Sequence, residues 1–144
     1  MADNKIFSNF TMKKLLSLLI LGFALFCSCV EPDGLWDPMK WKTNVSHMNK
    51  EHVIEVPSAG GTYVLKCKNY AGFWISSIDG MELGDDEDMH NVAREWYTVI
   101  IEGNVMTVTI VSNECPDDRT LDIGIRCGNA TDGFTFEQSK AEGR

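Results

Sequence analysis

The chain has 144 residues, of which 44% are hydrophobic, and its formal net charge at pH 7 is −8. Thirteen basic residues stand against twenty-one acidic ones, and this excess of negative charge excludes nucleic acid as an expected partner. The same charge excludes a protein that lies on anionic lipid through a basic face.

The first feature along the chain is a signal sequence. Two lysines precede an apolar run of thirteen residues, 15–27, which ends just before Ser28 and Cys29. A charged segment followed by such a run is typical of a cleaved signal peptide, and the run is too short to cross a bilayer. The pattern of a lipoprotein signal predicts that residues 1–28 are removed and that Cys29 is lipidated. An ordinary cleaved signal peptide remains the alternative, and Met12 is a second candidate start.

Residues 29–50 form a tether and a segment before the first expected strand. Cleavage before Cys29 leaves 116 residues with ten basic and twenty acidic side chains, enough for one domain with a single core. Residues 30–34 are acidic and turn-rich, so we expect them to be extended and solvated. This stretch resembles the acidic segment behind the lipidated cysteine of Bacteroidetes lipoproteins exported to the outer face of the outer membrane. A soluble linker, and with it a periplasmic orientation, remains equally open.

From residue 52 onward the chain consists of short β-rich runs separated by Gly, Asn, Pro and Asp. Seven runs are predicted as strands: 52–56, 62–68, 73–78, 96–102, 105–111, 120–127 and 133–138. No run has a convincing helical period over more than two turns. The sequence therefore predicts an all-β fold, an immunoglobulin-like two-sheet β-sandwich over residues 51–144.

Alternation within these runs predicts which faces are buried. Leu65 and Cys67 share one side of the second run, opposite two lysines, and we expect them in the core. Ile123 and Ile125 share one side of the sixth run in the same way. By the same parity, Trp74 is expected in the core together with the end of its run.

The sequence also predicts how several of these strands are connected. Residues 57–61 predict a turn between the first two strands, and Gly103-Asn104 predicts a hairpin between the fourth and the fifth. The longest connection, 79–95, carries four consecutive acidic residues. We expect a mobile loop or a helical turn there.

The order of several short motifs between residues 51 and 139 resembles the BACON family, a Bacteroidetes-associated β-sandwich domain. The motifs are residues 56–63, Trp74-Ile75, residues 108–113, Arg119-Thr120 and residues 134–138. The resemblance implies a carbohydrate-binding module, or a spacer that holds another protein away from the cell. The acidic loop before Trp96 is longer than is typical of the family.

Residues suited to catalysis or metal binding are few. The three histidines, His47, His52 and His90, are scattered and have no spacing typical of metal ligands. The acidic run 85–88 lacks the alternating spacing and the internal glycine of a calcium loop, so we interpret it as a solvated charge run. We predict no enzyme, no cofactor and no metal site.

The cysteines leave two possibilities open. Cys67 and Cys127 both point inward by alternation and lie on the strands that an immunoglobulin sandwich joins by a disulfide. Export makes such a bridge chemically possible, because disulfides persist in oxidising compartments. The other possibility is a pair of buried free thiols that pack as small hydrophobes. Cys115 has no obvious partner in either case.

Aromatic side chains are the candidate ligand contacts, because flat rings stack on the C–H faces of sugars. Trp36 and Trp41 precede the first strand and either cover the end of the sandwich or form an exposed platform. Trp96 and Tyr97 follow the long acidic loop. Since adjacent strand residues face opposite sides, one of the two must point outward or into the loop. This loop end is the predicted binding surface.

Two functions follow from this interpretation. The first is a non-catalytic lipoprotein of the cell surface that binds glycan through Trp96, Tyr97, Trp36 or Trp41. The second is an accessory lipoprotein of the cell envelope that binds a protein partner through an apolar or edge-strand patch and has no affinity for sugar. In both cases the contact with the membrane is made by the lipid on Cys29.

Overall fold

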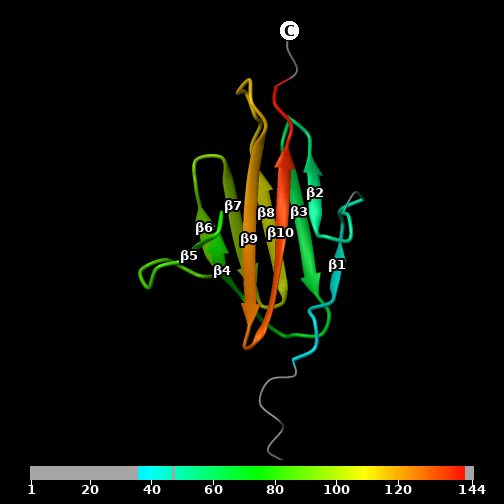
Figure 1. Ribbon diagram of the computed structural model, residues 1–144, viewed down its shortest axis with the longest axis vertical. Helices are drawn as coiled ribbons and strands as arrows, with labels where there is room; N and C mark the ends of the chain where they lie inside the picture. The colour runs from blue at the N-terminus through cyan, green and yellow to red at the C-terminus, as the bar shows by residue number, and fades with distance from the viewer. Residues whose placement is uncertain (1–35, 47, 142–144) are drawn as a thin grey trace, which may run out of the picture. The chain divides into compact units, whose positions relative to one another are not determined.

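The computed structural model describes residues 36–46 and 48–141, and Figure 1 shows them as a sandwich of two β-sheets. The strands are β1 (Trp41–Thr43), β2 (Val53–Val56), β3 (Gly61–Cys67), β4 (Trp74–Ile78), β5 (Met81–Glu82), β6 (Asn91–Ala93), β7 (Tyr97–Glu102), β8 (Val105–Ile110), β9 (Arg119–Cys127) and β10 (Ala130–Gln138). All seven expected strands are present, six of them within one residue of their predicted bounds, and β10 begins three residues before the predicted start. The expected signal peptide and Cys29 lie outside the described residues.

The two sheets have the strand order of an immunoglobulin-like sandwich. One sheet has the order β1-β3-β8-β7-β6 and the other β2-β10-β9-β4-β5. In chain order, β1-β3-β8-β7 corresponds to the ABED sheet of an immunoglobulin domain and β4-β9-β10 to its CFG sheet. β2 pairs with β10 in parallel, and every other pair of neighbours is antiparallel. The predicted fold class is confirmed.

The core lies between the two sheets and includes residues that alternation predicted, among them Leu65, Cys67, Ile123 and Ile125. Leu65 of β3 and Ile125 of β9 have no exposed surface, and neither does Phe136 of β10. The compact unit that contains this core begins at Trp36. Part of the segment before the first expected strand therefore belongs to the sandwich, since β1 pairs with β3 and Met39 is buried.

The long connection between β4 and β7 differs from the expectation. It contains no helical turn and instead forms two short strands, β5 and β6, at the edges of different sheets. Each has only two or three residues, too few for a period of two to show in the sequence. Among the described residues no helix is long and apolar enough to cross a membrane.

Trp74 is not in the core, so its prediction was wrong. The register of β4 against β9 shifts between Ile75 and Ser77, which marks a β-bulge. The extra residue reverses the alternation, so that Ile75 and Ile78 are both buried while Trp74 is half-buried. A bulge of one residue leaves no mark in the periodicity of so short a run.

Most of the motifs that resemble the BACON family meet at one end of the sandwich, where they form a cluster of hydrogen bonds that we call the polar lock. The exception is Trp74-Ile75, which pairs with Arg126 and Ile125 toward the other end of β9. The buried Gln138 side chain donates to the carbonyls of Pro57, Ser58 and Val111 at 2.9 to 3.3 Å. Its carbonyl oxygen accepts two hydrogen bonds from Arg119, at 2.9 and 3.2 Å. Buried polar groups need such partners, so these residues close the end of the fold.

Candidate functional site

A cleft of about 490 Å³ lies at the loop end that the sequence analysis singled out. We call it the loop-end cleft. Trp96 and Tyr97 line one side, where β7 begins, and Asp79, Met81 and Leu83 line the other, around the β4–β5 turn. Its size is within the range of small-molecule sites. The structure thus places the predicted aromatic pair beside the acidic connection.

The two aromatic rings have different roles in this cleft. Tyr97 is 5% exposed and belongs to the core, whereas Trp96 is half-buried at its edge. The rings meet edge to face, with centroids 4.9 Å apart. The guanidinium carbon of Arg119 lies 4.6 Å from the centre of the Trp96 ring, within cation–π range. Trp96 is therefore held in place from two sides.

The loop-end cleft is strongly acidic. Four carboxylates line it, from Asp79, Glu82, Glu87 and Glu95, against one cation, Arg94. Arg94 is engaged with Glu87 in an ion pair. The hydrogen bond from Arg94, followed by that from the Gly84 amide, lowers the pKa of Glu87 below its usual value. Asp79 uses one carboxylate oxygen to accept from the Asp122 amide. The Glu82 and Glu95 side chains make no hydrogen bond among the described residues, so they remain available as acceptors for hydroxyl groups.

The pKa of Tyr97 is raised, first by burial and then by the negative charge of Asp79. Its hydroxyl therefore stays protonated at neutral pH. The arrangement is suited to holding a polar ligand against a ring, since it combines a fixed aromatic side chain with several hydrogen-bond acceptors.

Trp41 is not an exposed platform. Its ring packs edgewise on Phe73 and Phe134, with centroids 5.2 and 5.0 Å away. Its indole N–H donates to Asp132 Oδ2 at 2.8 Å. Of the two possibilities left open by the sequence, Trp41 therefore covers the sandwich.

Trp36 is 46% exposed and stacks on Tyr70 with centroids 5.9 Å apart. It also lies against Gly128, in the turn after β9. The loop-end cleft is at the opposite end of this strand, near Arg119, and nine residues of β9 separate the two ends by roughly 27 Å. The structure therefore does not bring Trp36 and Trp96 into one surface.

Two features of the cleft were not predicted from the sequence. Arg119 covers Trp96 from a distant strand, although its motif had been noticed in the resemblance. Met81 is 71% exposed on β5, a strand that was not predicted. Neither position could be found from a local pattern, because β9 and β5 belong to the other sheet and reach Trp96 only when the two sheets pack together.

The cysteines in the described residues are all free thiols, so the possible Cys67–Cys127 bridge is absent from the structure. Cys67 has no exposed surface, and Cys127 is half-buried at the end of β9. Burial raises the pKa of the Cys127 thiol, which leaves less of the reactive thiolate. Cys115 lies in an exposed loop.

Thiol labelling of the unit that begins at Trp36 is expected to follow this order. Cys115 should react at once with an aromatic disulfide reagent, Cys127 more slowly, and Cys67 only after unfolding, because the reagent needs an accessible thiolate. In denaturant all three should react. A single reactive thiol in denaturant would instead demonstrate a Cys67–Cys127 bridge.

Comparison with known proteins relates the chain to a protein of solved structure. No family model matches the chain, and no curated protein sequence matches it. A protein from Bacteroides thetaiotaomicron, solved by NMR, is 37% identical, with 81% of this chain and 99% of that chain covered and a TM-score of 0.67.

Two further solved structures are more distant. The Bacteroides ovatus GH5 xyloglucanase in complex with a XXXG heptasaccharide is 13% identical, with 72% of this chain and 19% of that chain covered and a TM-score of 0.47. The M1 domain from titin is 16% identical, with 75% and 99% covered and a TM-score of 0.45. On the identity and coverage of the first comparison, the chain belongs to the same family as the Bacteroides thetaiotaomicron protein.

Proposed function

We propose that the protein is a non-catalytic glycan-binding module of a BACON-like type, anchored to the cell surface by lipid on Cys29. The observation that carries the proposal is the loop-end cleft, in which the Trp96 ring is fixed by Tyr97 and Arg119 beside available carboxylates. Sugar binding by stacking needs a ring whose orientation is set before the ligand arrives, since ordering a mobile side chain costs affinity.

The anchor and the surface location rest on the signal sequence and on the acidic tether behind Cys29. The relationship to a protein from Bacteroides agrees with a lipoprotein of that type. The acidic lining favours neutral glycans over uronates and sulfated chains, because like charges in one cleft repel each other.

Replacing Trp96 by alanine is expected to weaken glycan binding at least tenfold, a change of about 1.4 kcal/mol in binding free energy. The measurement is binding of the unit that begins at Trp36 to a broad array of neutral and acidic glycans, followed by titration of the best ligand. Trp36→Ala is the matched control, since it removes the most exposed described tryptophan at the other end of β9 and should leave binding unchanged.

Each variant is checked by circular dichroism and thermal melting, so that loss of fold is not mistaken for loss of the site. If Trp36→Ala abolishes binding while folded Trp96→Ala retains it, the cleft is the wrong site. If the folded domain binds no glycan on the array, the glycan-binding proposal is refuted.

One observation favours the second candidate, a protein-binding accessory. β5 is the edge strand of its sheet, and Met81 on it and Met89 nearby are 71% and 39% exposed. Edge strands and exposed methionines both accept protein partners, the first by strand addition and the second by adaptable apolar contact. A blank array would therefore direct the search to envelope proteins that dock on β5.

A further inference from the structure

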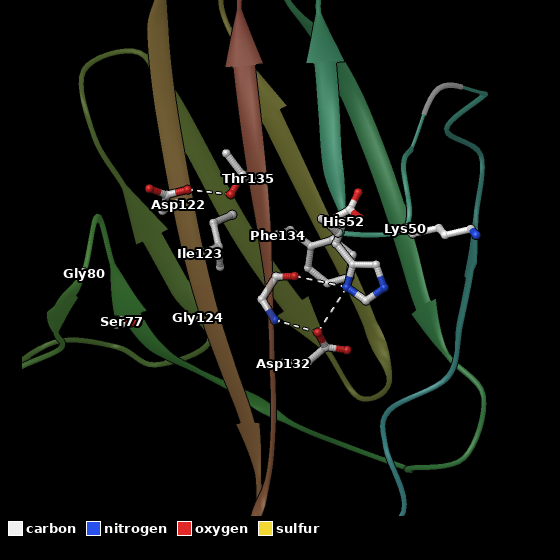
Figure 2. A pocket seen from close by; sticks show the side chains of 12 residues that line it. Lys50, His52, Ser77, Gly80, Asp122, Ile123, Gly124, Asp132, Phe134 and Thr135 are labelled. Atoms are coloured by element: carbon white, nitrogen blue, oxygen red, sulfur yellow. Dashed lines mark hydrogen bonds and ion pairs between the residues drawn. The ribbon is translucent and has the colours of Figure 1, made fainter.

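A second concave surface lies on the outer face of the sheet that contains β4, β9 and β10. It is a groove of about 570 Å³ that reaches from Ser77 on β4 across β9 and β10 to residues 50–52 in front of β2. Figure 2 shows its lining residues on these three strands, with His52 at one side. We call it the outer-face groove. No residue of the groove was among the predicted site residues.

The outer-face groove is hollow in the middle because two glycines, which have no side chains, are paired there on neighbouring strands. Gly124 of β9 is paired with Gly133 of β10. Neither position puts a side chain on the outer face, where neighbouring positions of both strands carry one. The Ser77 hydroxyl occupies the space that a Cβ on Gly124 would fill. The bulge in β4 therefore places this hydroxyl on the floor of the groove. Among the described residues, no hydrogen-bond partner is recorded for that hydroxyl.

The walls of the groove carry further polar groups in fixed positions. The Thr135 hydroxyl donates to Asp122 Oδ1 at 2.6 Å, as Figure 2 shows. His52 Nδ1 lies 3.0 Å from Asp132 Oδ1 and 3.2 Å from the Gly133 carbonyl oxygen. Since both neighbours are acceptors, Nδ1 carries a proton, and Nε2 is the ring nitrogen that these two contacts leave unused.

The His52 ring is also held by stacking on Phe134, with centroids 4.9 Å apart and planes 15° from parallel. The groove therefore combines hydroxyl groups, which both donate and accept, with an oriented ring nitrogen and a carboxylate. Its charged side chains include three carboxylates, those of Glu51, Asp122 and Asp132, and one lysine, Lys50. This chemistry fits an uncharged ligand rich in hydroxyl groups.

The outer-face groove and the loop-end cleft adjoin the same turn. Ser77 and Gly80 line the groove, whereas Ile78, Asp79 and Met81 line the cleft. The turn is fastened to β9, because the Asp79 amide donates to the Asp122 carbonyl at 2.8 Å and Asp79 Oδ1 accepts from the Asp122 amide at 3.0 Å. The two sites are thus held in a fixed relation on either side of one hairpin turn.

We infer that the outer-face groove is a second contact site for glycan, and that one neutral polysaccharide chain crosses the β4–β5 turn and occupies both the groove and the loop-end cleft. This inference rests on the proposed function of the cleft. Two contacts on one chain multiply its affinity, because the second contact forms at a high effective concentration once the first is made. Binding should therefore depend on chain length, and a short oligosaccharide should occupy one site only.

The test is an NMR titration of the ¹⁵N-labelled unit that begins at Trp36, with neutral β-glucan and mannan oligosaccharides from disaccharide to octasaccharide. We expect the longest members to shift the Trp96 indole signal together with the Gly124 and Gly133 amide signals. Their affinity should exceed that of the shortest members by roughly tenfold or more. Signals from Trp36, at the other end of β9, should not move.

Matched variants separate the groove from the cleft. Thr135→Val and Ser77→Ala remove the groove hydroxyls at almost constant shape, and both should abolish the advantage of long chains while leaving short ones unaffected. Thr131→Val is the control, because Thr131 is exposed on the same strand outside the groove lining. It should retain the full advantage.

Four results would overturn the inference. Equal affinity for short and long chains, or a shift of the Trp96 signal without Gly124 and Gly133, would refute the groove and leave the proposed function standing. Absence of any shift with any oligosaccharide would refute both. A groove that responds only to extended peptides would also refute it, since the ligand would then be a protein strand.

Discussion

Replacing Phe136 by alanine is expected to destabilise the domain by about 3–5 kcal/mol, the usual effect of removing a fully buried aromatic side chain. Phe136 lies on β10 with no exposed surface, and its ring centroid is 5.5 Å from that of Tyr63 on the facing sheet. The loss combines the transfer free energy of the ring with the cavity that it leaves. Urea denaturation of the unit that begins at Trp36, compared with wild type, measures it.

Glu137→Ala is the control for this variant, because Glu137 is the next residue of β10 and is exposed. A surface substitution of this kind should change the free energy of unfolding by no more than about 0.5 kcal/mol. A folded Phe136→Ala domain within about 1 kcal/mol of wild type would show that Phe136 does not join the two sheets as described.

The second large effect is expected at Gly60, in the turn between β2 and β3. Gly60 has a φ of +79°, and a Cβ there would overlap the Ile110 carbonyl oxygen and lie 2.8 and 2.9 Å from the Val111 carbonyl group. Ile110 ends β8 and Val111 follows it. The atoms that a Cβ would meet are therefore backbone atoms, and moving them would cost considerable free energy. Gly60→Ala should therefore cost about 3 kcal/mol, which combines the backbone strain with the overlap.

Gly80 supplies a matched comparison, since its φ is +76° and a Cβ there would have no atom within 4 Å. Gly80→Ala should show the strain alone, about 1 kcal/mol. Thermal melting of both variants gives the difference directly. Equal melting temperatures would mean that the close approach to Ile110 is absent in solution.

The contacts around the Gly60 turn also explain why the motifs that resemble the BACON family occur in this order. Its turn presents the Pro57 and Ser58 carbonyls to Gln138, and Gln138 in turn orients Arg119. The buried Asn113 completes the same end, because its side chain donates to the carbonyls of Asp117 and Ser139. These residues lock the sandwich, so their order in the sequence is evidence for the fold. Two members of the lock reach the candidate site: Arg119 covers the Trp96 ring, and the Val111 amide donates to the Trp96 carbonyl at 3.0 Å.

The sequence by itself determined the seven long strands, the buried faces of the strands that alternate regularly, and two of their turns. Alternation identified Leu65, Ile123 and Ile125, because a period of two is a local property that persists over five or more residues. The Gly103-Asn104 hairpin was equally local, and Gly103 has the positive φ that such a turn needs.

The tertiary structure alone decided the sites. Trp96 was found as a candidate, but Arg119 comes from β9 and Asp79 from the β4–β5 turn, and both reach it only through the packing of the sandwich. The outer-face groove depends on the pairing of Gly124 with Gly133, and the outward turn of Trp74 depends on a bulge. Register and bulges are set by contacts between residues far apart in the chain, so no local pattern encodes them.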